Sequence, residues 1–234
     1  VYRTLGDAPL IVRLVQMILG AAACVFLSQA GWRLFGKWAG VAAGFLLAVY
    51  APAIFFDSML QKSCIDVFLV CAMLWLLSEI EPRRGLGLCF GLGASLGLLV
   101  LSRENALVFG LVLAPWLLLF PGAAWPRRIA FAACFAAGVA LLLLPVALRN
   151  ASLSGDFHLT TSQFGHNFFI GNNPAADGTY KPLLFARGDP RVETQDALDL
   201  AEKLVGRQLT RAEVSEFYFE RGLHFIESQP VEWA

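Results

Sequence analysis

Residues 10–30 read LIVRLVQMILGAAACVFLSQA and contain one charged side chain, that of Arg13. A helix needs about 20 mostly apolar residues to cross the hydrocarbon core of a bilayer. A stretch of this length and composition therefore predicts a transmembrane helix. The fold then depends on how many such helices the chain contains and on which of their ends face the same side.

Five further apolar stretches precede residue 150, at about 38–56, 63–80, 86–102, 105–120 and 129–148. The chain of 234 residues is 57% hydrophobic and 15% charged, whereas an ordinary soluble domain has about 25% charged residues. The sequence therefore predicts an all-α membrane fold, with a polytopic bundle of about six transmembrane helices over residues 1–150. Such a bundle makes the chain a multi-pass integral protein of a plasma or inner membrane.

Glycines spaced four apart recur in the apolar stretches, as Gly40 with Gly44, Gly87 with Gly91, and Gly93 with Gly97. Small residues at this spacing let helix backbones approach closely where no hydrophobic effect drives helix association. We therefore expect a compact bundle with these glycines at helix–helix contacts.

The connections between the predicted spans differ in charge. Alternate connections carry two basic residues each, namely Arg33 with Lys37, Arg83 with Arg84, and Arg127 with Arg128. Lys and Arg concentrate in the cytoplasmic loops of membrane proteins. With six spans this pattern predicts one topology, in which both ends of the bundle and the chain from Arg149 onward face outward.

Residues 151–234 differ in charge from the bundle. Residues 1–150 contain 11 Lys+Arg and 6 Asp+Glu, a net charge of +5, whereas residues 151–234 contain 7 and 12, a net charge of −5. Such an asymmetry indicates two environments. We expect residues 151–234 to form a small, mostly helical loop domain on the extracytoplasmic (periplasmic) side.

Within this loop domain, residues 151–190 are rich in turn formers, with a short strand expected in the alternating stretch GDFHLTTSQF. Helices are expected at about 191–206 and 210–228, the second one starting with a capping box of Thr210 and Glu213. The chain begins at Val1 rather than Met and has no signal peptide, so we interpret it as an internal fragment of a longer membrane protein.

The sequence predicts no metal or nucleotide site. The five cysteines lie in apolar stretches without metal-ligand spacing, and there is no Ser-His-Asp signature or nucleotide phosphate loop. We therefore expect no cofactor in this stretch, with a divalent metal left open for the full-length protein. The expected surroundings are a lipid bilayer, with no nucleic-acid partner.

The charged residues at the outward ends of the spans are candidate site residues. Asp57 and Lys62 lie in the connection after the second span, and Asp66 lies about one turn into the third. Lys62 and Asp66 are spaced i, i+4, which suits an ion pair at a helix end. Alternatively, Lys62 lies beside an anionic lipid headgroup or substrate.

Arg103 and Glu104 occupy a very short outward turn, so their charges lie at headgroup depth. The planar guanidinium of arginine matches the oxygens of a phosphate group. The alternative is an arginine that extends to the membrane interface with Glu104 as its neighbour. The position of Arg103 favours phosphate binding.

A turn-rich stretch in the tail, GHNFFIGNNPAADGTY at residues 165–180, supplies further polar candidates. Their side chains could bind sugar hydroxyls, or they could satisfy their own backbone. His166 could also titrate near neutral pH. The candidates on this stretch are His166, Asn172, Asn173, Asp177 and Tyr180.

Two stretches, GLGASLGLLVLSRENALVFG around Arg103 and GNNPAADGTY at residues 171–180, are the most telling parts of a resemblance that covers nearly the whole chain. The order of features resembles the polytopic glycosyltransferases of the GT-C superfold. It is most similar to the dolichyl-phosphate-mannose protein mannosyltransferase-like group, glycosyltransferase family 39.

This resemblance implies an integral-membrane glycosyltransferase that transfers a sugar from a polyprenyl-phosphate-linked donor, outside the cytoplasm, to a protein, lipid or glycan acceptor. By resemblance, Arg103 and Lys62 would hold the lipid phosphate, and residues 171–180 would line the acceptor side. The catalytic acidic residue of such enzymes usually lies in the first outer loop, which would precede Val1. Gln61 and Lys62 stand where many relatives carry an acidic residue.

Two other function classes are compatible with a multi-pass chain. A transporter or flippase would place ionisable groups near the bilayer midplane and show internal repeats. Here the charges lie at one face and no repeat is visible. A non-catalytic membrane scaffold whose tail binds a partner is the third reading.

Overall fold

A computed structural model describes residues 9–83, 85–154, 164–179 and 193–233 of the chain. Every regular element in these ranges is a helix. The chain divides into two compact units, Val1–Arg149 and Asn150–Ala234, which are described separately below. The all-helical class predicted from the sequence is confirmed.

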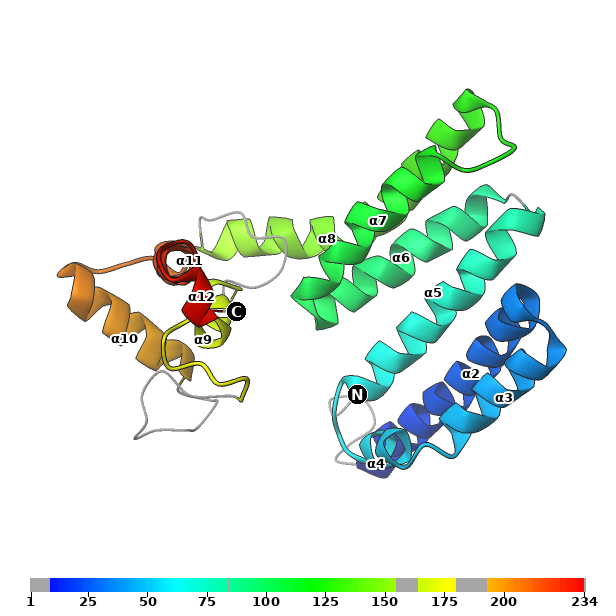
Figure 1. Ribbon diagram of the computed structural model, residues 1–234, viewed down its shortest axis with the longest axis horizontal. Coiled ribbons are helices and arrows are strands. Elements are labelled where there is room, and N and C mark those ends of the chain that lie inside the picture. Colours follow the sequence, from blue (N-terminus) through cyan, green and yellow to red (C-terminus); the bar gives the residue numbers. More distant parts are fainter. Residues whose placement is uncertain (1–8, 84, 155–163, 180–192, 234) are drawn as a thin grey trace. The chain divides into compact units, whose positions relative to one another are not determined.

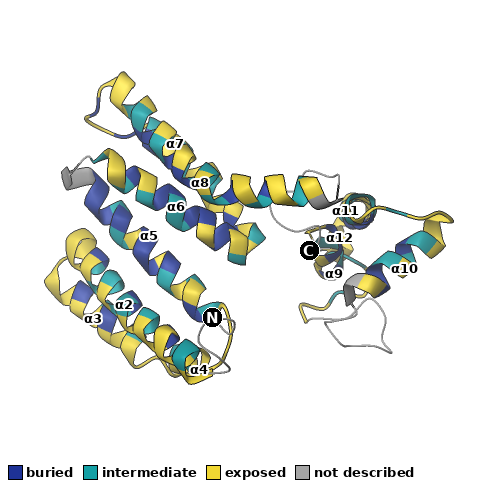
Figure 2. Ribbon diagram, turned by 180° about the vertical axis from the view of Figure 1, so that it is seen from behind, coloured by how far each residue is buried: buried dark blue, intermediate teal, exposed yellow. Residues whose placement is uncertain are grey.

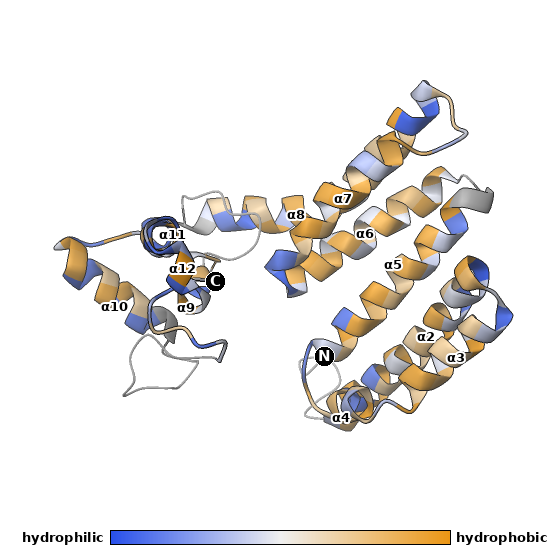
Figure 3. Ribbon diagram, viewed as in Figure 1, coloured by the Kyte–Doolittle hydropathy of each residue, from blue (hydrophilic) through white to orange (hydrophobic). Residues whose placement is uncertain are grey.

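Unit 1 contains the apolar helices. They are α2 (Pro9–Phe35), α3 (Lys37–Ala48), α4 (Ala51–Ser58), α5 (Ser63–Arg83), α6 (Leu86–Ser102), the 3-10 helix η1 (Glu104–Ala106), α7 (Leu107–Leu118) and α8 (Trp125–Ser154). Four helices lie side by side in the order α3, α2, α5 and α6, and each packs on the next (Figure 1). The surfaces of these helices are apolar along most of their length (Figure 3).

A proline explains why the second apolar stretch forms two helices. Pro52 lies in the first turn of α4, where proline is tolerated. A proline has no N–H for the carbonyl four residues before it, and its ring clashes with that carbonyl, so α3 ends at Ala48, four residues before Pro52. The pair α3 and α4 bends by 50° across the break between Ala48 and Ala51.

By length and composition, three helices of the described residues can each cross a membrane: α2, α5 and α8. A fourth span results if the bent pair α3 and α4 is counted as one. The other two predicted spans correspond to shorter helices, since α6 has 17 residues and α7 has 12. Twelve residues extend about 18 Å, less than the hydrocarbon thickness of about 30 Å.

Two of the three predicted glycine pairs lie at close helix contacts. A side chain at Gly40 or Gly44 would collide with α2, whose backbone lies against both. A side chain at Gly93 would collide with the backbone of α8, and Gly138 of α8 has the same relation to α6. The prediction was wrong for the third pair, because Gly87 has open space around it and its partner meets only a leucine side chain.

The buried core of unit 1 lies between α5, α6 and α8 (Figure 2). Leu92, Leu96 and Val100 of α6 are fully buried in it. On the other side of α5, Phe26 of α2 stacks on Trp75 with ring centroids 5.0 Å apart. These contacts fix α5 in the middle of the packed helices, so its two ends are held by neighbours on both sides.

Unit 2 contains α9 (Phe164–Gly171), α10 (Glu193–Val205), α11 (Arg211–Ser228) and α12 (Pro230–Trp233). The predicted capping box forms, because Thr210 accepts from the Glu213 N–H and Glu213 accepts from the Thr210 N–H. Tyr218 of α11 donates its hydroxyl to the carbonyl of Ala197 at 3.1 Å. Burial raises the pKa of Tyr218 to about 12, so this hydroxyl remains a donor at neutral pH.

The sequence did not predict α9, which packs on α11 through a glycine. Gly165 has no room for a side chain against the backbone of Ser215, and its N–H donates to the Ser215 hydroxyl at 3.0 Å. The strand expected in GDFHLTTSQF falls almost wholly outside the described residues. Its last residue, Phe164, begins α9.

Candidate functional site

Polar groups from three helices meet at one end of unit 1. They come from the start of α5, the end of α6 and the second turn of α2. The shared element is the connection from α4 into α5, which ends at Lys62. This end of the bundle contains two of the candidate residues predicted from the sequence, Lys62 and Arg103.

An ion pair joins α5 to the residue that follows α6. Nε of Arg103 lies 2.8 Å from Oδ2 of Asp66, and the hydroxyl of Ser102 donates to the other oxygen of the same carboxylate. The Arg103 side chain is 51% exposed, whereas that of Asp66 is 16% exposed. Asp66 therefore holds Arg103 through Nε, while about half of the arginine side chain stays exposed.

Asp66 does not form the pair with Lys62 that one of the two alternatives for Lys62 predicted. Lys62, predicted to pair with it, instead donates from Nζ to the main-chain carbonyl of Ser102 at 2.6 Å. The last carbonyls of a helix have no partner within the helix, so a lysine there satisfies one and meets the negative end of the helix dipole. The packing of α5 on α6 thus brings Arg103 to Asp66 and moves Lys62 to the carbonyl.

A buried glutamine of α2 fixes the connection that leads to Lys62. Gln16 is 5% exposed. Its side-chain nitrogen donates to the carbonyl of Gln61 at 2.7 Å and lies 3.3 Å from the sulfur of Cys64. Sequence reasoning missed both Gln16 and Ser102. The available signal was a polar residue within an otherwise apolar helical stretch.

Asp57 lies apart from this group. Its carboxylate, on α4, faces the bare Cα of Gly20 on α2, where a side chain would collide with it. It lines a cavity of about 240 Å³ between α2, α3, α4 and α5. Among the described residues, no hydrogen bond or ion pair connects it to Lys62 or Arg103. Glu104 begins η1, directly after Arg103.

The polar candidates of unit 2 bind their own backbone. The amide of Asn172 donates to the carbonyl of Phe168 at 2.8 Å, and that of Asn173 donates to the carbonyls of Phe169 and Ile170. Asp177 accepts from the N–H of Thr179 at 3.1 Å. Of the two alternatives left open by the sequence, the structure shows backbone satisfaction for these three side chains.

Two further candidates of this stretch have other outcomes. His166 lies on α9 rather than in a loop, and it is buried, with 4% exposure. A surface role as a polar loop residue is therefore excluded for it. Tyr180 lies outside the described residues.

Chemically, the end of unit 1 is suited to an anion at a membrane surface. It presents an arginine held by one side of its guanidinium and a lysine at the ends of apolar helices. The described residues contain no cluster of three or more His, Cys, Asp or Glu that could hold a metal ion. These features and the apolar helices indicate an integral-membrane, multi-pass protein with cationic side chains gathered at one end of its helices.

The chain belongs to the family described as dolichyl-phosphate-mannose-protein mannosyltransferase. The family's sequence model matches residues 2–148, which is 147 of the 234 residues and includes the whole cationic end of unit 1. The resemblance inferred from the sequence is thereby confirmed over residues 2–148, and the domain is one of a membrane glycosyltransferase family. No curated protein and no solved structure matches the chain.

Proposed function

We propose that the chain is part of an enzyme that transfers a sugar from a polyprenyl-phosphate-linked donor to an acceptor on the extracytoplasmic side of the membrane. The observation that carries the proposal is the convergence of Lys62 and Arg103 at one end of α5 and α6, inside the region that matches the glycosyltransferase family. Both residues are assigned to the phosphate of the lipid donor.

The hydrogen bonds of Arg103 support this assignment. Of the three Arg103 nitrogens, only Nε donates to Asp66. The two terminal nitrogens of Arg103 have no partner among the residues that the structure describes. A guanidinium presents five N–H donors in a fixed fork, which matches two oxygens of a phosphate. Arg103 can therefore keep its bond to Asp66 and bind phosphate at the same time.

Lys62 supports the assignment in a similar way. Its ammonium group has three donors, and one of them goes to the carbonyl of Ser102. Breaking the bond between sugar and phosphate leaves negative charge on the departing lipid phosphate. Cations already in place, in a setting of low dielectric constant, stabilise that charge without reorganising.

The proposal includes a topology. Six spans, with the bent pair α3 and α4 as one and the short helices α6 and α7 as two, place the doubly basic connections on the cytoplasmic side. Lys62, Arg103 and the loop domain of residues 151–234 then lie outside. The acceptor role of residues 171–180 rests on the resemblance alone, because the amides of Asn172 and Asn173 already bind backbone carbonyls.

The acceptor hydroxyl also needs a general base. We assign no catalytic base to the described residues and expect an acidic residue elsewhere in the enzyme. The first donors to assay are polyprenyl phosphates that carry a mannosyl group or another hexosyl or pentosyl group.

Replacing Arg103 tests the proposal. We expect Arg103→Ala to lower sugar transfer by about 100-fold or more, the usual loss when one group that stabilises developing charge is removed. Transfer from radiolabelled polyprenyl-phosphate sugar would be measured in membranes with matched protein levels. Lys37→Ala removes a cation at the opposite end of the helices and should retain transfer. Unchanged transfer in Arg103→Ala would remove Arg103 from the site.

A further inference from the structure

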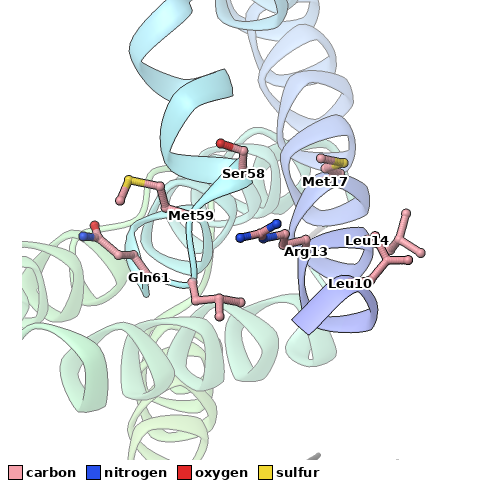
Figure 4. Close-up of a pocket in the computed structure, with 8 residues that line it drawn as sticks. Leu10, Arg13, Leu14, Met17, Ser58, Met59 and Gln61 are labelled. Carbon is pink, nitrogen blue, oxygen red and sulfur yellow. The ribbon is translucent and has the colours of Figure 1, made fainter. Parts of the chain in front are cut away.

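A cavity of about 660 Å³ lies beside the candidate site, between the start of α2 and the connection from α4 to α5 (Figure 4). Its apolar lining comes from both segments and consists of Leu10, Leu14, Met17, Met59 and Leu60. The polar part of the lining is Arg13, Ser58 and Gln61. In Figure 4, the guanidinium of Arg13 extends from α2 toward the segment that contains Met59 and Gln61.

Arg13 is an exposed cation without a counter-ion in the described part of the chain. Two of the described acidic residues at this end point elsewhere: Asp66 pairs with Arg103, and Asp57 faces Gly20. Among the described residues, the cavity thus combines one positive charge with walls that are mostly apolar. This combination is complementary to an amphiphile with a negative headgroup and an acyl chain.

The depth of Arg13 agrees with a lipid headgroup. Gln16 is level with Cys64, in the first turn of α5, because their side chains are in contact. Arg13 precedes Gln16 by three residues, which places it about 4.5 Å further out along α2. The apolar stretch of α2 begins at Leu10, so Arg13 lies within one turn of its outer end, where a long cationic side chain reaches the headgroups.

The apolar lining is open to the bilayer. Leu10 is 66% exposed, and Leu14 and Met17 are each about half exposed. Residues that a protein leaves uncovered at this depth are covered by acyl chains in a membrane. A phospholipid can therefore enter the cavity sideways, with its phosphate at Arg13 and one chain along the leucines.

We propose that this cavity is a binding site for an anionic phospholipid of the bilayer, separate from the site assigned to the sugar donor. The phosphate lies at Arg13, and Ser58 and Gln61 are polar groups beside it. Because the backbone of Gln61 is also held by Gln16, the bound lipid steadies the segment that leads directly to Lys62. The proposal concerns lipid binding and stands independently of glycosyl transfer.

Native mass spectrometry of the purified protein tests this site. The protein would be released from micelles that contain phosphatidylglycerol and phosphatidylcholine in equal amounts. We expect one phosphatidylglycerol to be retained, and Arg13→Gln to lower its retention about fivefold, the effect of roughly one cation near a membrane surface. Lys37→Gln, a matched loss of charge at the other end of α2 and α3, should retain it.

Three other outcomes would overturn the proposal of a phospholipid site. Equal retention by Arg13→Gln and the unchanged protein would show that Arg13 holds no lipid. Equal retention of phosphatidylglycerol and phosphatidylcholine would show that the cavity does not select an anionic headgroup. If added polyprenyl phosphate displaced phosphatidylglycerol in an Arg13-dependent manner, the cavity would belong to the donor site instead. Loss of sugar transfer with lipid binding intact would bear on the proposed function alone.

Discussion

The two ends of α5 carry ion pairs of opposite character. At one end, Arg103 and Asp66 form a pair in which the arginine is half exposed and has terminal nitrogens to spare. At the other end, Arg33 lies 2.6 Å from Glu79, whose side chain is 1% exposed. In the first pair the cation is the more open partner and has donors to spare, whereas in the second the carboxylate is buried and Arg33 is 38% exposed.

This difference in exposure indicates which ion pair is the candidate for substrate binding and which one stabilises the fold. A charge removed from water must be matched by partners, and removing one partner then costs several kcal/mol. An exposed pair contributes little to stability, typically below about 1 kcal/mol. Mutations at the two ends of α5 should therefore separate stability from activity.

The largest expected effect is on stability, at the buried end. Arg33→Ala takes one ion-pair partner from the buried carboxylate of Glu79 and should destabilise the fold by about 2 to 3 kcal/mol. Thermal unfolding in detergent micelles, followed by circular dichroism, would measure the change. Lys37→Ala, at the exposed first residue of α3, should shift stability by less than about 1 kcal/mol. Equal effects of the two variants would contradict the contrast.

The next effect is on activity, at the open end. Asp66→Asn removes the charge that holds Nε of Arg103 and should lower transfer about tenfold, mainly by raising KM for the donor, while stability changes by less than about 1 kcal/mol. Asp66→Glu should restore part of the loss because it restores the carboxylate. A loss of activity that only follows a loss of folded protein would make Asp66 a structural residue instead.

The smallest effect is expected from Ser102. Ser102→Ala deletes the hydroxyl that donates to Asp66 but keeps the main-chain carbonyl that accepts from Lys62. Transfer should fall only about twofold, since Arg103 and Lys62 keep their partners. Steady-state kinetics would measure it. A loss as large as that of Asp66→Asn would mean that the hydroxyl itself contacts the substrate.

Local patterns in the sequence predicted the parts of the fold that local physics determines. Apolar stretches predicted helices, and the spacing of Thr210 and Glu213 predicted a capping box that forms. The sequence missed the break before α4, although Pro52 was its visible cause. It also missed α9, whose packing depends on the contact between Gly165 and Ser215, 50 residues apart.

The candidate site was predictable in its residue types but not in its pairing. Lys62 and Asp66 are neighbours on one helix, so sequence spacing alone favours their pairing. The structure pairs Asp66 with Arg103, 37 residues away, because packing of α5 on α6 decides which charges meet. The partner of Gln16 was unpredictable for the same reason, since Gln61 is 45 residues distant.

The glycine contact between α6 and α8 has a mechanical consequence. Where Gly93 and Gly138 bring the two backbones together, a side chain at either position would meet the backbone of the other helix and force the two helices apart. Arg103 lies ten residues beyond Gly93, about 15 Å along the helix axis. If a substitution of Gly93 tilted α6 by about 10°, Arg103 would move by roughly 2.6 Å. A substitution remote from the arginine would then be expected to displace it.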